Sequence, residues 1–270
     1  MKSIILHVHA DAGQESRLQA AFDLARAFEG HISCLEVTPL HDFVTVDPFG
    51  GALILPEDLE SIREGEMRQR KAIEDRMIRE NVSWDWRHVD GDIARSLLSE
   101  SRLGDIMVLS QAAAKIDMNS PLPLVAEISV HARCPVLSVP AGLSAFDVNG
   151  TAMVAWNGST ESCVALRSAL PLLKCAQTVH VVTVSGGDSN IFPATQASEY
   201  LSRHGIASEL HEWPKKDRTT EEALLAAITE LETGWLVMGA FGHSRLRETI
   251  FGGVTRFLLS EARIPLLLAH

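Results

Sequence analysis

The sequence carries the same order of patterns twice, and this duplication constrains the fold more than any other feature. Residues 1–143 and 150–270 each open with a short apolar run, a polar turn and an amphipathic segment. The closing segments agree most closely, because HARCPV (131–136) parallels EARIPL (261–266). The duplication predicts two consecutive domains, 1–143 and 150–270, joined through a linker at 140–150.

Apolar runs of strand length alternate with helical patterns in both halves. This alternation favours parallel strands with helices on both faces of a sheet, so we expect two tandem doubly wound α/β domains with flavodoxin- or Rossmann-like layering. The expected strands are 3–9, 32–37, 105–110 and 135–139 in the first half, and 152–156, 178–184, 234–239 and 265–269 in the second.

The helix after the first strand has recognisable end signals in each half. In the first half, Ser16 and Gln19 have the spacing of a capping box, and Gly30 suits the C-terminal stop. In the second half, Ser159 is the expected cap and Glu161 lies in the first turn.

Net charge and apolar run lengths exclude several classes of protein. A formal charge of −11 and a pI of about 5.4 argue against nucleic-acid binding, which needs clustered Lys and Arg. No apolar run reaches the roughly 20 residues that span a bilayer, and the first residues lack the pattern of a signal peptide. Four widely spaced cysteines fit reduced thiols, so we expect a cytoplasmic protein without membrane or nucleic-acid partners.

The stretch from 236 to 255 is the part of the chain most suited to binding a ligand. A buried strand ends at Gly239, Gly242 follows, and Gly252 and Gly253 precede a helical pattern. Such a strand, glycine loop and helix start let backbone N–H groups cradle a phosphate. The first half keeps the strand, but residues 110–120 contain no glycine, so only one such loop exists per chain.

The motif Gly239-x2-Gly242-x9-Gly252, placed inside this repeat, resembles the signature of the universal stress protein family. The resemblance covers the whole chain as two tandem domains with the adenine-nucleotide α-hydrolase-like fold. It implies an adenine-nucleotide (ATP or AMP) binding protein with a regulatory or sensor role in the stress response. It also implies that the apolar closing strands, 135–139 and 265–269, face each other, so that the two domains form an intramolecular pseudo-dimer. A further homodimer of whole chains is compatible with this arrangement.

The resemblance also implies which residues contact the nucleotide. The glycine loop and the helix after it would hold phosphates and ribose, and the turn after strand 152–156 would hold adenine and ribose, with apolar contacts from two other strands. The implied contacts are Ala155, Trp156, Asn157, Val184, Met238, Gly239, Gly242, Gly252, Gly253, Val254 and Thr255.

Two positions depart from the family pattern. Asn157 stands where an acidic residue is usual; its amide still hydrogen-bonds a ribose hydroxyl, but it adds no charge that would hold a metal, so Mg²⁺ is not indicated. Gly253 stands where a Ser or Thr hydroxyl would contact phosphate, and Thr255 would replace that hydroxyl only if the helix began there. Both departures favour nucleotide binding over catalysis. They also count against tight binding of a triphosphate.

Two alternative functions remain open from the residues alone. A weak ATP hydrolase or phosphate-transfer enzyme would use Arg245 and Arg247 in the loop, but no base accompanies them and His243 has no orienting partner in the sequence. A binding protein for another small ligand or for a protein partner would leave the loop vacant. We therefore assign no catalytic residue and no metal ligand; His7 and His9 share a strand face but lack a third ligand.

Overall fold

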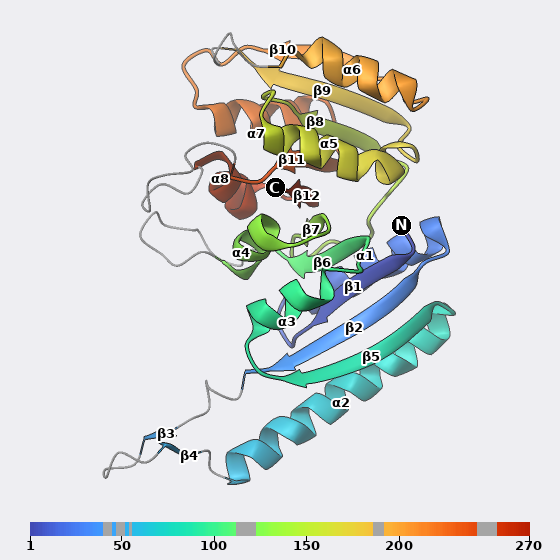
Figure 1. Cartoon of the computed structure of the whole chain (residues 1–270), viewed down its shortest axis with the longest axis vertical. Helices are drawn as coiled ribbons and strands as arrows, with labels where there is room; N and C mark the ends of the chain where they lie inside the picture. Colours follow the sequence, from blue (N-terminus) through green and yellow to red (C-terminus); the bar gives the residue numbers. More distant parts are fainter. Residues whose placement is uncertain (40–44, 47–51, 54–55, 112–122, 186–191, 242–252) are drawn as a thin grey trace.

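The computed structural model describes residues 1–39, 45–46, 52–53, 56–111, 123–185, 192–241 and 253–270. Within these residues one mixed sheet of ten strands runs through the whole molecule, in the order β10-β9-β8-β11-β12-β7-β6-β1-β2-β5 (Figure 1). Residues 1–143 supply five of these strands and residues 150–270 supply the other five. The predicted α/β class with largely parallel strands is confirmed.

In the first half the strands of the large sheet are β1 (Ser3–Val8), β2 (His31–Thr38), β5 (Ser83–Asp90), β6 (Ile106–Ser110) and β7 (Val136–Val139). The helices are α1 (Gln14–Phe28), α2 (Pro56–Glu80), α3 (Ile93–Glu100) and α4 (Leu124–His131), and a small separate hairpin consists of β3 (Thr45–Val46) and β4 (Ala52–Leu53).

In the second half the strands are β8 (Thr151–Ala155), β9 (Thr178–Val184), β10 (Glu209–Trp213), β11 (Trp235–Gly239) and β12 (Leu266–Ala269). The helices are α5 (Thr160–Leu173), α6 (Ala194–Arg203), α7 (Thr220–Glu230) and α8 (Gly253–Glu261).

The two halves meet through their closing strands. β7 and β12 pair antiparallel, with Leu137 opposite Leu267, whereas all other neighbouring strands of the large sheet run parallel. Both strands are fully apolar apart from Ser138 and are buried along their length. The sequence expectation that these strands face each other is confirmed by this pairing.

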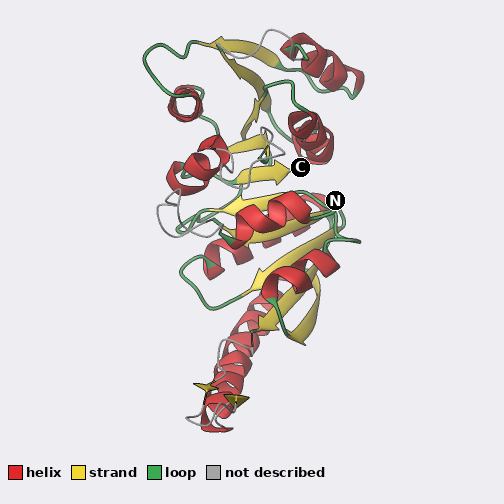
Figure 2. Ribbon diagram, turned by 60° about the vertical axis from the view of Figure 1, so that its left-hand side comes forward, coloured by secondary structure: helices red, strands yellow, loops and turns green. Residues whose placement is uncertain are grey.

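Helices cover both faces of the sheet (Figure 2). Alternate strand residues point to opposite faces, so Ile4 and Leu6 of β1 join one apolar core while Ile5 between them joins the other. The first core contains residues of α1, α2, α5 and α6, and the second contains residues of α3, α4, α7 and α8. This division of helices between the two faces is the doubly wound arrangement.

The segment predicted as a linker, 140–150, packs closely against both halves. Phe146 is buried and its ring meets that of Trp235 edge-on, with centroids 6.2 Å apart and planes at 77°. The backbone N–H of Phe146 donates to a carboxylate oxygen of Asp23 on α1, at 2.8 Å. The connection is therefore part of the apolar core.

The end signals of α1 differ from those expected from sequence. The helix begins at Gln14 after Gly13, which makes no side-chain cap, so Ser16 and Gln19 lie inside the helix and form no capping box. The left-handed residue at the C-terminal end is Glu29 (φ 46°), one residue before the predicted Gly30. The Ser159 cap of α5 is confirmed, because its hydroxyl oxygen accepts the N–H of Ser162 at 3.2 Å.

The long helix α2 projects from the lower end of the molecule in Figure 1. Ile73 and Met77 of α2 are buried against the sheet, whereas Met67 and Ile78 are exposed. No helix among the described residues combines the length and apolar character needed to cross a membrane.

Candidate functional site

The candidate site lies where the strand order of the second half changes direction. From β8 the chain continues to β9 and β10 on one side, then returns to place β11 and β12 on the other. The carboxyl ends of β8 and β11 are therefore the topological switch point, where open α/β sheets bind their ligands. Ala155, the last residue of β8, pairs with Met238 of β11 and with Val182 of β9. The carboxyl ends of these three predicted strands therefore lie together.

The turn after β8 is held by its own hydrogen bonds. Trp156 is buried; its backbone N–H donates to the carbonyl of Val182 and its indole Nε1 donates to the carbonyl of Phe192, both within 2.9 Å. Asn157 is exposed, and its Oδ1 accepts the N–H of Ser159 at 3.1 Å. The Nδ2 amide and the second lone pair of Oδ1 therefore remain for a ligand.

Gly239 ends β11 directly against the first turn of α5. A Cβ at this position would lie 2.6 Å from both the carbonyl carbon of Glu161 and the backbone nitrogen of Ser162. Real Cβ atoms do not approach backbone this closely, so only glycine fits between β11 and α5. The first glycine of the motif thus has a packing role whether or not a ligand is bound.

The helix after the glycine loop begins at Gly253. This residue is exposed, and a Cβ on it would meet no atom within 4 Å. The first N–H groups of a helix have no partner inside the helix and carry a partial positive charge, so the start of α8 suits an anion. Val254, the next residue, is part-buried.

Thr255 lies in the first turn of α8 but is buried. Its hydroxyl oxygen accepts the backbone N–H of Phe241 at 3.4 Å, and Phe241 has left-handed backbone (φ 57°). The hydroxyl therefore joins the end of the β11 turn to α8. This geometry favours a structural role for Thr255 over contact with phosphate.

Part of the predicted site lies outside the described residues. Gly242 and Gly252 fall there, as do His243, Arg245 and Arg247. Val184 is described: it ends β9, next to β8, and is part-buried opposite Trp213. The carboxyl edge thus brings together Ala155, Trp156, Asn157, Val184, Met238 and Gly239, with Gly253 at the start of α8.

The corresponding switch point of the first half is filled by Arg17, the fourth residue of α1. Its Nε donates to the carbonyl of His7 on β1, at 3.0 Å, and one terminal nitrogen donates to Ser110, the last residue of β6. The guanidinium also meets both carboxylate oxygens of Asp11, at 2.8 Å. A buried cation therefore bridges the carboxyl ends of β1 and β6.

His7 lies beside this guanidinium and is itself buried. Burial, with smaller contributions from Arg17 and His9, lowers the pKa of His7 from 6.5 to about 3. Its ring stays neutral over the physiological range and stacks on His9, with centroids 5.9 Å apart. Both histidines point to one face as predicted, and they lie next to a fixed positive charge, which disfavours a metal ion there.

Sequence reasoning missed Arg17. Arginine is common on amphipathic helices, and no spacing rule indicated that residue 17 would meet Asp11, His7 and Ser110. The only available signal was a charge beside the apolar positions of α1, on the side that packs against the sheet.

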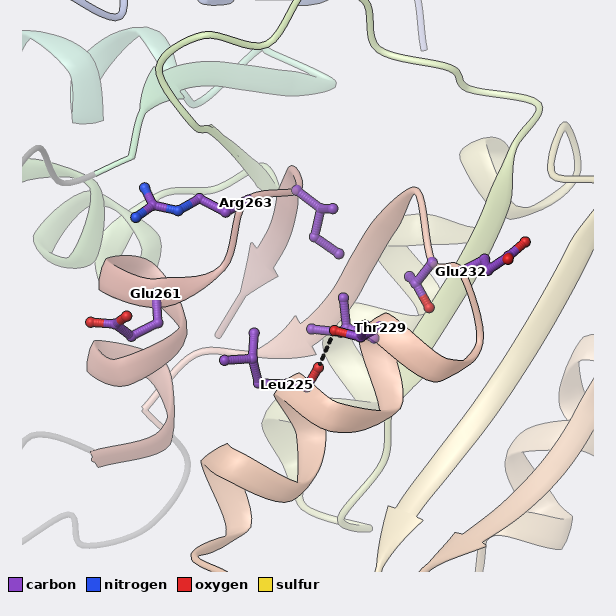
Figure 3. Close-up of a pocket in the computed structure, with 8 residues that line it drawn as sticks. Leu225, Thr229, Glu232, Glu261 and Arg263 are labelled. Atoms are coloured by element: carbon purple, nitrogen blue, oxygen red, sulfur yellow. Dashed lines mark hydrogen bonds between the residues drawn. The ribbon is translucent and has the colours of Figure 1, made fainter.

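A shallow hollow lies away from the candidate site, between the C-terminal ends of α7 and α8 (Figure 3). It lies near the amino ends of β11 and β12, which is the opposite edge of the sheet. In the figure Glu261 and Arg263 extend from the α8 side, while Thr229 donates to the Leu225 carbonyl within α7. Its lining residues are Leu225, Ile228, Thr229, Glu232, Thr233, Glu261, Arg263 and Ile264.

Comparison with known proteins relates the fold to solved structures. No family model matches the sequence, and no curated protein matches it. A universal stress protein from Archaeoglobus fulgidus superposes with a TM-score of 0.78, covering 99% of this chain and 96% of that chain at 16% identity.

Two proteins from Pseudomonas aeruginosa also match over nearly the whole chain. One, provisionally identified as a universal stress protein, has a TM-score of 0.57, 14% identity and coverage of 99% and 93% of the two chains. The other, of unknown function, has a TM-score of 0.54, 14% identity and coverage of 100% and 92%. The chain therefore has the fold of a universal stress protein, with both halves included in the match, as the sequence motif indicated.

Proposed function

We propose that the protein is a tandem universal stress protein that binds one adenine nucleotide per chain and acts as a regulatory or sensor protein. The nucleotide-binding domain is 150–270, and 1–143 is a degenerate partner domain. One observation carries this proposal. The switch point of the first half is filled by the guanidinium of Arg17, the fourth residue of α1, whereas the equivalent residue of the second half, the fourth of α5, is the smaller, uncharged Cys163. The proposed setting is the cytoplasm, because all four cysteines are free thiols.

The proposed contacts follow the carboxyl edge of the second half. The N–H groups at the start of α8, near Gly253, would hold phosphate together with the glycine loop. Asn157 would donate its Nδ2 amide to a ribose hydroxyl, and Ala155, Val184 and Met238 would provide apolar contact to the base. ATP and AMP share the base and ribose that these groups recognise.

The pairing of β7 with β12 supports an intramolecular pseudo-dimer of the two domains. The two buried strands form a continuous antiparallel contact at the centre of the sheet, where a dimer of separate domains would have its axis. In this arrangement the first domain supplies structural support to the second.

A hydrolytic function receives less support from the geometry. Phosphate transfer needs a positioned water or acceptor and a charged group or metal that stabilises the transition state. The exposed polar group after β8 is the uncharged Asn157. We therefore propose binding as the function and keep weak ATP hydrolysis as the second candidate.

Substitution at Gly253 tests the nucleotide site without disturbing the packing. Since a Cβ there meets nothing within 4 Å, Gly253→Asp will be accommodated, and its carboxylate at the start of α8 will favour the helix. The same charge will repel phosphate, so we expect the affinity for ATP and AMP, measured by calorimetry, to fall at least about tenfold.

The matched control is Gly65→Asp on α2, where a Cβ also meets nothing within 4 Å and the charge change is the same. We expect this variant to bind like the parent protein. Absence of bound nucleotide in native mass spectrometry, together with no calorimetric binding of ATP, ADP or AMP, would refute the proposed function. Turnover of ATP by the parent protein but not by Gly253→Asp would favour the hydrolase.

A further inference from the structure

Three side chains of the outermost strand pair of the second half converge on one point. Glu209 of β10 is the register partner of His180 on β9, and His211 follows two residues later on the same face. His180 is buried, His211 is part-buried, and the Glu209 side chain is 65% exposed. We refer to these three residues as the β9–β10 cluster.

The ligand atoms of the β9–β10 cluster have the separations of a metal site. His180 Nδ1 lies 3.0 Å from His211 Nε2 and 3.4 Å from Glu209 Oε2, and His211 Nε2 lies 3.7 Å from the same oxygen. In a tetrahedral site with ligands about 2.0–2.1 Å from zinc, ligand atoms are about 3.3 Å apart. The three separations lie on both sides of that value.

A proton alone accounts less well for this arrangement. A hydrogen bond between the two imidazoles places one proton between His180 Nδ1 and His211 Nε2, and leaves the carboxylate oxygen of Glu209 near both nitrogens without a role in that bond. One divalent ion accepts all three lone pairs at once. The two rings are inclined at 68° to each other, and the three ligand atoms all lie within 4.8 Å of one another.

A second group of similar composition in the first half provides a contrast. Glu36, Glu66 and His88 also lie close together, but Glu66 is paired with the Arg63 guanidinium at 3.1 Å. Arg63 also holds both oxygens of Asp90, which in turn accepts from His88. A cation of the protein already neutralises that group, whereas no Lys or Arg forms a salt bridge with the β9–β10 cluster among the described residues.

We propose that the β9–β10 cluster is a binding site for a divalent transition-metal ion, with Zn²⁺ as the ion best matched to its ligands. His180 Nδ1, His211 Nε2 and Glu209 Oε2 would be the three protein ligands, and water would occupy the fourth position on the exposed side near Glu209. The site is separate from the proposed nucleotide site, because His180 lies toward the amino end of β9 and Val184 at its carboxyl end.

Metal binding at this place would fasten the outer strand of the sheet. β10 is the last strand on its side, and its pairing with β9 is its contact with the sheet. An ion held by ligands from both strands stabilises the pair through linkage, because it binds the folded arrangement and not the separated strands.

Calorimetry with Zn²⁺ and absorption spectroscopy with Co²⁺ test the proposal on untagged full-length protein cleared of metal with a chelator. We expect one ion per chain and the intense visible bands of a tetrahedral Co²⁺ site. In His211→Gln the Zn²⁺ affinity should fall at least about tenfold, since even loss of an outer-shell group costs 10–100-fold. The tetrahedral Co²⁺ bands should disappear.

The matched controls are His88→Gln, in the contrasting group, and His204→Gln, an exposed histidine on the end of α6. Both should retain the parent affinity. Binding that is unchanged in His211→Gln, binding lost in His88→Gln, or no ion bound by the parent protein would overturn the proposal. If His211→Gln does not fold, the exposed Glu209→Gln variant decides by the same two measurements.

Discussion

Gly239 and Glu161 are in backbone contact: a Cβ on Gly239 would lie 2.6 Å from the Glu161 carbonyl carbon. This contact lets the first turn of α5 pack directly on the end of β11, and apolar residues of both elements belong to the same core. The first glycine of the motif therefore serves the fold, while Gly253, with open space around it, is available for ligand contact.

We expect Gly239→Ala to lower the free energy of unfolding by about 1–3 kcal/mol, the usual effect of overpacking. Gly253→Ala meets no neighbouring atom and removes backbone freedom at a helix start, so its effect should be within about 0.5 kcal/mol of zero or stabilising. Urea unfolding of both variants measures the difference. Equal stability of the two variants would contradict the packing role of Gly239.

Removal of the buried guanidinium should destabilise the first half. Arg17→Met keeps the apolar stem but removes the guanidinium donors from the carbonyls of His7 and His9, of which His9 keeps the backbone N–H of Asp11. We expect the free energy of unfolding to fall by about 2–4 kcal/mol. This is less than the loss from breaking a fully buried ion pair, because Asp11 is partly exposed.

The control for this variant is Arg26→Met on the same helix; its side chain is 46% exposed, and its ion pairs with Asp23 and Glu80 should together contribute less than about 1 kcal/mol. Denaturant unfolding of both variants gives the comparison. A smaller loss in Arg17→Met than in Arg26→Met would show that the first switch point is not held by this cation.

Stability should depend on pH through His7. In the unfolded chain this imidazole takes up a proton near pH 6.5, whereas in the folded protein its pKa is about 3. The unfolded state therefore binds more protons between these values, so the free energy of unfolding decreases as the pH falls from about 6.5 toward 3. The contribution is on the order of 1 kcal/mol per pH unit.

Substitution isolates this contribution from other titrating groups. His7→Leu should show a smaller decrease in stability between pH 6.5 and 4 than the parent protein, while the exposed His204→Leu variant should keep the parental slope. Thermal or urea unfolding across this pH range supplies the slopes. Parallel curves for the parent protein and His7→Leu would contradict the buried neutral imidazole.

Phe146 should stabilise both halves together. Its ring contacts Trp235 in the second half and its backbone is anchored to Asp23 in the first, so Phe146→Ala should cost about 3–5 kcal/mol. Unfolding should be followed by a near-ultraviolet signal from the buried tryptophans and by far-ultraviolet circular dichroism. Ser144→Ala, in the same segment, is the control. If Phe146→Ala lowers the free energy of unfolding by less than about 1 kcal/mol, segment 140–150 only connects the two halves.

Eight of the ten strands of the large sheet could be predicted from sequence, because strand and helix periods differ and because the pattern occurs twice; the outermost strands β5 and β10 were not among the expected strands. β9 was predicted with its observed bounds, and the family resemblance implied that the closing strands face each other, as the β7–β12 pairing shows. The turn after β8 was also identifiable, since Ser159 has a standard capping position.

The features that sequence could not reveal depend on contacts between distant residues. The close approach of α5 to Gly239, the position of Arg17 between β1 and β6, and the burial of Phe146 all require the packed structure. The β9–β10 cluster likewise depends on the register of two strands whose residues 180 and 209 are far apart in sequence. Local patterns carry no information about such registers.

The antiparallel pairing of β7 and β12 has a consequence for synthesis of the chain. β12 is formed by Leu266–Ala269, so one edge of the apolar β7 has no partner until those residues have left the ribosome. An unpaired apolar edge is a template for pairing with other chains. Nascent or truncated chains ending before residue 266 should therefore self-associate through β7, and the last strand acts as an internal cap against aggregation.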